Sequence, residues 1–350
     1  MTAERSQRVS ELYSGAFSAL GEIMDIINYT TPLEQIEKLK KQNLTIENES
    51  EAIEALSLYG YSNLIKSYRE PYTHVKNGLK VYRSGVSFKQ VCSLYILDKN
   101  LRNAVMASML DLEEYIKEAA ADVVASSFGT REEDYLQFRN YQNKRKKKSR
   151  FTLKGILDTM NTSLKSEKDP IMHYRKEHGI VPPWILFKSL YFSTITNFID
   201  QFKRKEKDEM VSKLYDTGDL ELSMESYRKL MMDTLFICQE YRNLAAHGGR
   251  TYNHSCDKKL RIEEIFGSIE NIPTSGFSQL LCLLQLLKYK TPYENLLDVL
   301  QGQVNRHCNE YPQDVTYLGQ ILNIDITPHK VVYVTQNSNK YHTSPYCSGI

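Results

Sequence analysis

The amino-acid sequence predicts an all-α fold, on three observations. Most long segments carry apolar residues three and four positions apart, which is the spacing of an amphipathic helix. Alternation of apolar and polar residues, which is typical of strands, is strong only in the tail. The chain has 350 residues, of which 41% are hydrophobic, and this is enough for one large or two modest domains with a sizeable core.

The helical spacing gives a definite set of expected helices. They cover residues 4–28, 32–43, 49–69, 87–127, 131–141, 151–164, 183–202, 205–215, 222–247, 257–269, 275–289 and 293–307. The second begins with Thr31 as N-cap and Pro32 at the first helical position, and both suit the unpaired amides there. Trp184 lies at an apolar helix start and is expected in the core. Residues 164–183 are typical of a polar connector.

Residues 329–347 differ from the helical body. A β-branched and aromatic run is followed by an Asn/Ser turn and a second short run, so a small C-terminal β-hairpin is expected. His342 and Cys347 lie close together here, and the segment resembles the first half of a small bacterial zinc-binding hairpin. The later cysteine pair of that pattern is missing, and two ligands seldom make a structural zinc site. A plain hairpin is therefore the favoured interpretation.

Charge and cysteine usage restrict the partners and the compartment. The formal net charge is only +2, so contacts with nucleic acid must come from local clusters of Lys and Arg. The six cysteines are scattered singly, without a CxxC pair, which indicates a reducing compartment. The start has no apolar signal-peptide core, and the most apolar run, residues 277–289, is too short to span a bilayer. We expect a cytoplasmic protein without a membrane partner.

The stretch E-Y-R-N-L-A-A-H-G-G-R-T-Y-N-H, residues 240–254, combines polar residues with helix-ending glycines. On a helix, Asn243 and His247 are four residues apart and lie on nearly the same face, and Arg242 has a side chain long enough to converge with them. Two glycines then allow the chain to leave the helix. Towards the other face lies an apolar stripe that would anchor the helix in a bundle, formed by Tyr227, Leu230, Met231, Leu235, Cys238, Tyr241 and Leu244.

These residue types suit one chemistry in particular. Cleavage of RNA through its own 2′-hydroxyl requires a base, an acid and positive charge around the phosphorus, but no metal ion. Histidine can serve in the proton transfers because it titrates near neutrality, and arginine offers a permanent fork for phosphate oxygens. The sequence has no cluster of Asp and Glu of the kind that holds a pair of Mg²⁺ ions. We therefore expect no metal and no other cofactor.

The spacing of Arg242 and His247 has a second interpretation. A helix C-terminus that is capped by histidine and carries a solvated arginine would give the same pattern. The same spacing also occurs from Arg69 to His74, where Pro71 breaks the helix and no apolar stripe frames the pair. Spacing alone therefore does not separate catalysis from capping.

The wider sequence resembles a known family. R-N-L-A-A-H followed by G-G-R-T-Y-N is similar to the RNxxAH and downstream R-x-x-N signature of abortive-infection proteins of the AbiD and AbiF type, a branch of the HEPN superfamily of ribonucleases. Three further blocks resemble the family in its order. They are T-P-L-E-Q-I-E-K-L with the later G-Y-S-N-L in residues 31–68, D-K-N-L-R in 97–119, and P-P-W-I-L-F in 181–199. The resemblance covers residues 30–260.

The resemblance implies a helical HEPN core, metal-independent RNA cleavage and a toxin that defends bacteria against phage by arresting the infected host. It also implies a link to a small regulatory RNA. Arg242 and His247 match the catalytic pair, Asn243 matches the polar residue beside them, and Arg250 and Asn253 match secondary positions that we take as RNA-binding.

The expected domains combine this resemblance, which gives the second of them, with the helix and hairpin patterns described above. They are an N-terminal helix (1–30), a HEPN-like abortive-infection domain (31–260), C-terminal helices (261–328) and the hairpin tail (329–350).

Two positions depart from the family pattern. Gly248 stands where relatives often carry a second histidine, which could weaken activity, and Lys117 stands where the early helix often has an arginine. One histidine per chain cannot act as base and acid at the same moment. We therefore expect a two-fold homodimer in which both copies of His247 meet at a composite site.

The dense basic run at residues 144–150 is a second candidate site. Basic side chains bind phosphates without reading sequence, so the expected RNA-binding residues are Lys144, Arg145, Lys146, Lys147, Lys148 and Arg150. Nearby aromatic residues could stack bases, namely Tyr135, Phe138, Tyr141 and Phe151. The alternative is a solvated, disordered loop.

Two further positions in the D-K-N-L-R block helix have two interpretations each. Glu113 fits an ordinary ion pair with Lys117, four residues on. In the alternative, the carboxylate of Glu113 or Glu114 reaches across the bundle to orient Arg242. Arg102 has the same ambiguity.

The sequence thus favours a metal-independent endoribonuclease of an abortive-infection system. The alternative is a non-catalytic RNA-binding module that holds a structured regulatory RNA, and Gly248 keeps it open. A third class is a toxin controlled by a protein antitoxin.

Overall fold

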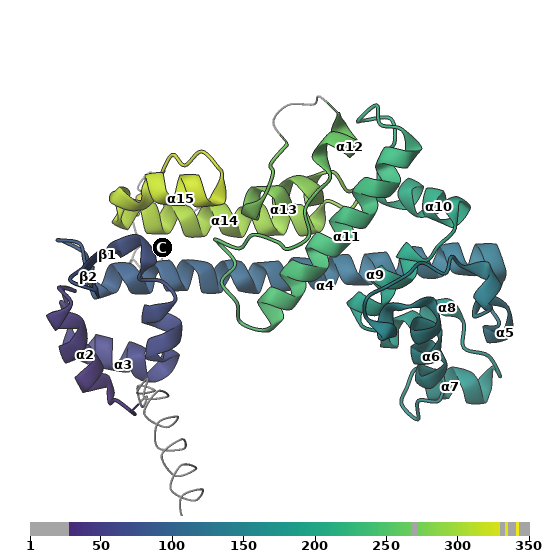
Figure 1. The fold of residues 1–350 in the computed structure, drawn as a ribbon, viewed down its shortest axis with the longest axis horizontal. Coiled ribbons are helices and arrows are strands. Elements are labelled where there is room, and N and C mark those ends of the chain that lie inside the picture. Colours follow the sequence, from purple (N-terminus) through teal and green to yellow (C-terminus); the bar gives the residue numbers. More distant parts are fainter. Residues whose placement is uncertain (1–27, 268–271, 330–332, 335–340, 343–350) are drawn as a thin grey trace, which may run out of the picture. The chain divides into compact units, whose positions relative to one another are not determined.

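The computed structural model describes residues 28–267, 272–329, 333–334 and 341–342, and most of these residues are helical. The expected all-α class is confirmed (Figure 1). The expected helix 4–28 lies outside the described residues, apart from its last residue. The chain divides into two compact units, Met1–Lys89 and Gln90–Ile350.

From residue 28 onward, where the structure describes it, the first unit contains two α-helices and a hairpin before α4 begins. Helix α2 (Pro32–Lys41) begins as expected, because the Thr31 side chain accepts from the amide of Glu34 while the Glu34 carboxylate accepts from the amide of Thr31. Helix α3 (Glu49–Tyr59) ends at Gly60, whose φ is +77°, so the expected single helix over 49–69 is wrong. A π-helical turn at Ser62–Lys66 and a 3₁₀ turn at Glu70–Tyr72 follow.

A β-hairpin in this unit corrects the expectation that strands occur only in the tail. Strands β1 (Thr73–Lys76) and β2 (Leu79–Tyr82) pair antiparallel, with Lys76 opposite Leu79. Between them, Asn77 and Gly78 both have positive φ, at 52° and 75°. Asn-Gly is the dipeptide that such two-residue hairpin turns prefer.

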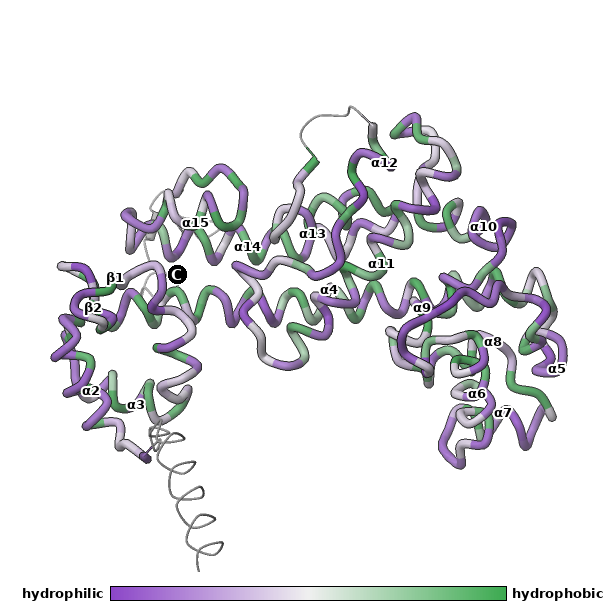
Figure 2. The backbone as a smooth tube through the Cα atoms, in the orientation of Figure 1, coloured by the Kyte–Doolittle hydropathy of each residue, from purple (hydrophilic) through white to green (hydrophobic). Residues whose placement is uncertain are grey.

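The second unit is organised along helix α4 (Phe88–Phe128), which matches the expected helix 87–127. Its apolar residues recur at helical spacing and are almost fully buried, as in the series Val91, Leu94, Leu101, Val105, Met109, Leu112, Ile116 and Val123. Figure 2 shows hydrophobic and hydrophilic positions alternating along this helix. On one side, Asn100 of α4 donates to Gln303 of α14 (Thr291–Glu310) at 2.7 Å.

Helix α11 (Met224–Ala246) carries the expected apolar stripe and crosses α4 in Figure 1. Six of the seven stripe residues are buried, and Leu244 is half-buried. The helix packs against α9 (Phe192–Asp200), α10 (Arg204–Leu214), α12 (Ile262–Phe266) and α13 (Gly276–Gln285). Its orientation is therefore fixed by neighbours along its length.

The other helices of this unit are short. They are α5 (Glu132–Tyr135), α6 (Leu153–Ser163), α7 (Ile171–Glu177), α8 (Pro183–Leu186) and α15 (Val315–Leu322), with 3₁₀ turns at Phe138–Asn140, Ser149–Phe151, Phe187–Ser189 and Pro312–Asp314. The expected polar connector 164–183 therefore contains a helix, α7.

Two expected helices are shorter because side chains capture backbone groups that a helix would use. The helix expected over 131–141 ends at Tyr135, and the side-chain amides of Gln137 and Asn140 donate to the carbonyls of Glu133 and Asp134. The helix expected over 257–269, whose last two residues lie outside the described part, begins only at Ile262, because carboxylates of α11 accept from the amides of the residues just before α12.

The helix expected over 183–202 is also interrupted. Its chain leaves the helical conformation at Leu190, with ψ of 148°, and restarts as α9. Ile185, Leu186, Ile195 and Phe198 are all buried, so the break lets both halves present apolar residues to the core.

The tail forms the expected hairpin over the residues that are described. Strands β3 (Tyr333–Val334) and β4 (Tyr341–His342) pair antiparallel, with Tyr333 opposite His342. Cys347 and the side chain of His342, the two possible zinc ligands of the tail, lie outside the described part of the chain. Among the helices that the structure describes, none combines the length and the apolar character needed to cross a membrane.

Candidate active site

The Arg-Asn-His motif lies at the C-terminal end of α11. Arg242 and Asn243 are in the last turns and are half-buried, and the side chain of Arg242 keeps 25% of its surface exposed. His247 is the C-cap residue and is exposed. Its amide donates to the carbonyl of Asn243 at 3.1 Å, so the two residues lie one helical turn apart as expected. Both members of the expected catalytic pair can therefore be reached from solvent.

The two glycines after His247 end the helix in a Schellman motif. The amide of Gly249 donates to the carbonyl of Leu244 at 2.9 Å, and the amide of Gly248 donates to that of Ala245 at 3.2 Å. Gly248 has a φ of +71°, which favours glycine over any residue with a Cβ. At Gly249, a Cβ would lie 2.2 Å from the Leu244 side chain. The departure from the family pattern at Gly248 thus has a local backbone reason.

Glu113 of α4 contacts both Lys117 and Arg242, so the structure combines the two interpretations of this residue. Its Oε1 lies 2.8 Å from the Lys117 ammonium, and its Oε2 lies 3.4 Å from Arg242 Nε. Only 10% of the Glu113 side chain is exposed. Glu113 therefore lies beside Nε of this guanidinium, and the terminal nitrogens have no hydrogen-bond partner among the described residues.

Helix α4 also holds the loop that follows the motif. Arg102 donates from Nη1 to the carbonyl of Gly248 at 3.1 Å. One turn earlier, the fully buried carboxylate of Asp98 accepts from the amides of Thr251 and Tyr252 at 2.9 and 2.8 Å. Arg102 thus contacts the backbone of the loop after the motif, which is neither of the two interpretations that the sequence offered for it. Asp98 was missed by the sequence interpretation, although it belongs to the same D-K-N-L-R block.

Beyond this loop the chain runs back along α11, where two acidic residues fix it. The carboxylate of Glu240 accepts from the amides of Asp257 and Lys258, at 2.8 and 3.3 Å. Two turns earlier, the buried carboxylate of Asp233 accepts from Arg261. Neither acidic residue was identified from sequence, because the backbone amides that each carboxylate accepts from lie 17 to 28 residues further along the chain.

The secondary positions Arg250 and Asn253 lie in the loop held by Asp98, and both are half-buried. The positive charge of Arg250 is close enough to Tyr252 to oppose the rise in its pKa that burial causes. Their location next to the motif is compatible with the expected RNA-binding role.

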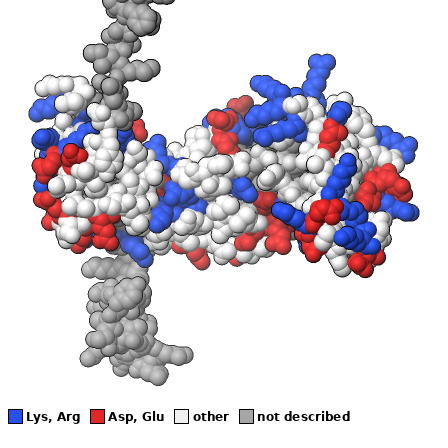
Figure 3. Space-filling model, turned by 90° about the horizontal axis from the view of Figure 1, so that it is seen from below, with Lys and Arg blue, Asp and Glu red and all other residues white. Residues whose placement is uncertain are grey.

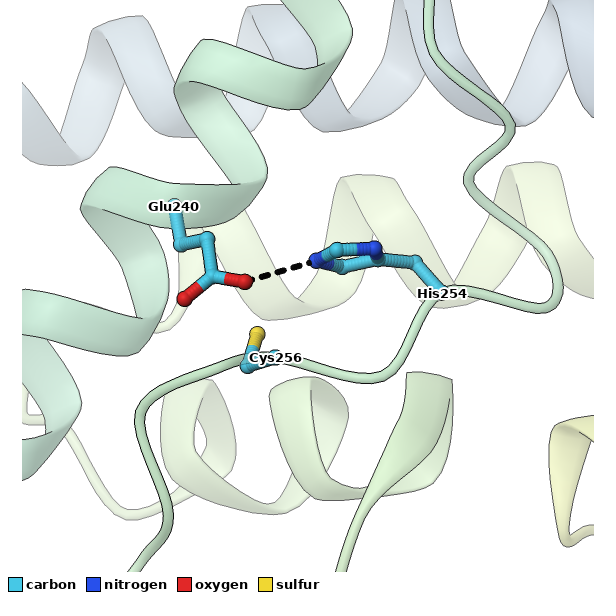
Figure 4. A group of neighbouring side chains, drawn as sticks. All are labelled: Glu240, His254 and Cys256. Atoms are coloured by element: carbon cyan, nitrogen blue, oxygen red, sulfur yellow. Dashed lines mark hydrogen bonds and ion pairs between the residues drawn. The ribbon is translucent and has the colours of Figure 1, made fainter.

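Glu240 of α11 forms a three-residue cluster with His254 and Cys256 of the returning segment (Figure 4). Each residue offers one atom that could bind a metal ion, and these three atoms all lie within 4.8 Å of one another. Among the described residues, this is the one such group of three or more. His254 Nε2 lies 3.0 Å from Glu240 Oε1, and burial raises the pKa of the Cys256 thiol. The ligand types suit Zn²⁺, but the Glu240 carboxylate is already engaged by the imidazole and two backbone amides. We therefore interpret the cluster as a set of hydrogen bonds that holds the returning segment against α11.

A cavity of about 350 Å³ lies beside Glu113. Its lining includes Glu114, Lys117 and Trp184. Trp184, which was expected in the core, is half-buried and faces this cavity. Open space therefore adjoins the carboxylate that contacts Arg242.

The basic run at 144–150 has alternating exposure. Lys144 and Lys146 are turned toward Asp200 of α9, with a Lys144 Nζ to Asp200 Oδ1 distance of 3.0 Å and a still closer contact from Lys146. The other basic residues of the run are exposed, namely Arg145, Lys147, Lys148 and Arg150. Figure 3 shows Lys and Arg side chains projecting together from the half of the molecule that contains α9 and α10 in Figure 1.

The aromatic residues near this run do not form the expected stacking surface. Tyr135 is fully buried and Tyr141 is 5% exposed, and their hydroxyls donate to the carbonyls of Val181 and Tyr135. Burial raises the pKa of both phenols. Phe138 is exposed and Phe151 half-buried, so only these two could meet a base.

Comparison with known proteins identifies the family. Residues 54–253 match the family of Abi-like proteins. Because this is more than half of the chain, the protein belongs to that family, and the expected abortive-infection assignment is confirmed. The matched region contains α4, α11 and the whole Arg-Asn-His motif. No curated protein and no solved structure matches the chain.

Proposed function

We propose that this Abi-like protein is a HEPN-type endoribonuclease that acts in abortive infection, the defence in which an infected bacterium is arrested to stop a phage. The observation that carries the proposal is the end of α11. There an exposed His247 follows an Arg242 whose Nε faces Glu113 and whose terminal nitrogens have no hydrogen-bond partner among the described residues. If His247 only capped the helix and Arg242 were only a solvated side chain, the nearly buried carboxylate of Glu113 would not be needed to hold the arginine.

The proposed reaction is a transesterification within the RNA strand. A base removes the proton of the 2′-hydroxyl, the O2′–P bond forms and the P–O5′ bond breaks, and an acid protonates the departing O5′. The products are a 2′,3′-cyclic phosphate and a 5′-hydroxyl. Arg242 stabilises the charge on the phosphorane, Asn243 binds or orients the phosphate, and His247 transfers the protons. The nucleophile is already part of the substrate, so the reaction requires no metal ion.

One imidazole cannot be base and acid at once, which supports a site shared by two chains. In an isologous dimer, the two copies of His247 would meet across one phosphodiester. Cleavage per chain should then fall as the protein is diluted below the dissociation constant of the dimer. Constant cleavage per chain over the whole dilution series would reject the composite site.

End-group analysis tests the chemistry. Purified protein is incubated with single-stranded RNA in excess chelator, and the new ends are examined by mass spectrometry. Cyclic phosphate and 5′-hydroxyl ends that are lost in His247→Ala are expected. New ends with a 5′-phosphate, or cleavage that stops on chelation, would contradict the proposal.

The backbone at Gly248 favours a second candidate, an RNA-binding module that does not cut. Because φ is +71° there, this helix end disfavours the second histidine that relatives often carry. Such a module would hold a structured regulatory RNA at the same helix end.

Expression in bacteria separates the two candidates. If the protein is a nuclease, expression of the wild type should arrest growth and expression of His247→Ala should not. If the protein only binds RNA, the two chains should affect growth equally. RNA that copurifies equally with both chains, without growth arrest, would favour the binding module. RNA that copurifies and restrains cleavage until it is removed would support regulation by a small RNA.

A further inference from the structure

A second charged site lies along the first half of α11, away from the Arg-Asn-His motif. It is a cavity of about 440 Å³ between α10, α11, the segment at Lys144 and the returning chain at Lys258–Arg261. Its lining holds seven cationic side chains and three carboxylates. Met232 and Phe236 add an apolar part. This size suits a small ligand or part of a larger one.

On one side of the cavity, a single carboxylate forms ion pairs with three lysines. Asp200 is contacted by Lys144 and Lys146, and its Oδ1 lies 3.6 Å from the ammonium of Lys207. Burial would raise the pKa of Asp200, but the lysine contacts outweigh it and lower this pKa to about 2. Only 8% of the Lys207 side chain is exposed. Burial, together with the neighbouring Lys144, lowers the pKa of Lys207, and the Asp200 carboxylate opposes this shift.

On another side of the cavity, a second carboxylate forms ion pairs with two basic side chains. The fully buried Asp233 lies 2.7 Å from the ammonium of Lys258 and receives Arg261 at 2.9 Å on both of its oxygens. At the rim, Arg204 is exposed and makes no salt bridge with any residue that the structure describes. Within the lining of this cavity, two carboxylates are thus shared by four basic residues, and positive charge there is not fully compensated; these residues are Lys144, Lys207, Lys258 and Arg261.

We propose that this cavity binds phosphate groups. Phosphate supplies the missing negative charge, and its oxygens can accept from lysine ammonium groups and the arginine fork together. The inference concerns binding alone and does not depend on the cleavage chemistry at His247. It also changes the role of the basic run, because Lys144 becomes part of a cavity wall while its exposed neighbours remain available to a strand outside.

The phosphate could come from the backbone of an RNA strand or from a free nucleotide. The experiment therefore uses two probes, a fluorescent single-stranded RNA oligomer followed by anisotropy and ATP followed by calorimetry. Both are measured on the full chain carrying His247→Ala, so that cleavage does not interfere. The test variant is Arg204→Ala. The matched control is Lys205→Ala, which removes an exposed charge from the same turn of α10 but lies outside this cavity.

For the probe that occupies the cavity, Arg204→Ala should weaken binding about tenfold, the usual effect of losing one charge-assisted contact. Lys205→Ala should leave its affinity within about twofold. If Arg204→Ala weakens the binding of RNA alone, the cavity binds an RNA strand. The slope of log binding constant against log salt concentration should then be smaller by about 0.7 in the variant. Loss for ATP assigns it to a free nucleotide.

A second variant, Lys207→Met, removes the buried ammonium and must give the same loss for the same probe. The proposal is overturned if neither probe binds, or if both variants bind as the parent does. It is also overturned if Lys205→Ala weakens binding as much as Arg204→Ala, because the effect would then be a general one of surface charge.

Discussion

Glu113 Oε2 of α4 lies 3.4 Å from Arg242 Nε of α11, although the two residues are more than a hundred positions apart in sequence. Both atoms are buried and neither has an aligned hydrogen bond within the described residues. The contact is therefore an ion pair that orients the guanidinium without occupying its outer nitrogens. This makes Glu113 a positioning residue for the proposed reaction, and its removal should affect turnover more than binding.

Glu113→Gln should lower kcat by about tenfold, because a misplaced guanidinium stabilises the transition state less well, and should leave KM nearly unchanged. The measurement is steady-state cleavage of a fluorescent RNA oligomer. Glu114→Gln is the matched control, since Glu114 is its exposed neighbour on the same helix. A merely structural Glu113 would lower the melting temperature while kcat per folded chain stayed constant.

Asp98→Ala should destabilise the fold by about 3 kcal/mol, because the buried amides of Thr251 and Tyr252 would lose their charged acceptor. Urea unfolding measures this, and hydrogen exchange at the two amides should quicken. Asp111→Ala on the same helix is the control and should change stability by less than about 0.5 kcal/mol. Unchanged exchange at both amides would show that Asp98 does not hold the loop.

Gly248→Ala should cost about 1 kcal/mol of unfolding free energy, because alanine is strained at a φ of +71° even though the space around its Cβ is open. Gly302→Ala is the opposite case. Gly302 lies within α14 with open space and without positive φ, so the alanine should stabilise by up to about 1 kcal/mol. Equal effects of both substitutions would contradict the conformation assigned to Gly248.

Asp200→Asn should reveal a pH-dependent contribution to stability. The folded-state pKa of Asp200 is lowered from 3.8 to about 2, so its carboxylate stabilises the fold above pH 3.8 and this contribution is lost as the pH falls towards about 2. The wild type should exceed the variant by about 2 kcal/mol at neutral pH, and the gap should close over that window. Urea unfolding at a series of pH values measures it.

The control is Asp158→Asn, whose carboxylate belongs to an exposed ion pair with Lys154 and should show almost no gap at any pH. A gap for Asp200→Asn that stayed constant down to the lowest pH would mean that the three lysines do not depress this pKa.

The sequence predicts the long elements well because their burial follows a simple period. Helices α4 and α11 match the expected ranges within two residues at each end. The hairpin at residues 73–82 was missed although Asn77-Gly78 is a strong local signal, because each strand has only four residues, too few to show a clear period.

The failures at 131–141 and 257–269 have a different cause. Side-chain amides and carboxylates take the backbone partners of a helix there, and the carboxylates belong to residues far away in sequence. Helical spacing carries no information about such long-range contacts.

The same distinction applies to the candidate site. Arg242 and His247 stand in a contiguous motif, so a single stretch of sequence identifies them. Asp98 contacts Thr251 across 153 residues, and this contact depends on the register between α4 and the loop after α11. The cavity lined by Lys144, Lys207 and Arg261 is likewise assembled from three separate segments. No spacing within one segment predicts such an arrangement.

The central claim is that His247 transfers protons during RNA cleavage, and the most direct test compares two single substitutions. His247→Ala and His74→Ala each remove one exposed histidine that follows an arginine by five positions, but only His247 caps α11. The initial rate of RNA cleavage is measured for both variants and for the wild type at equal folded concentration. The account predicts a loss of at least about 100-fold for His247→Ala and none for His74→Ala. Equal rates for all three chains would contradict it.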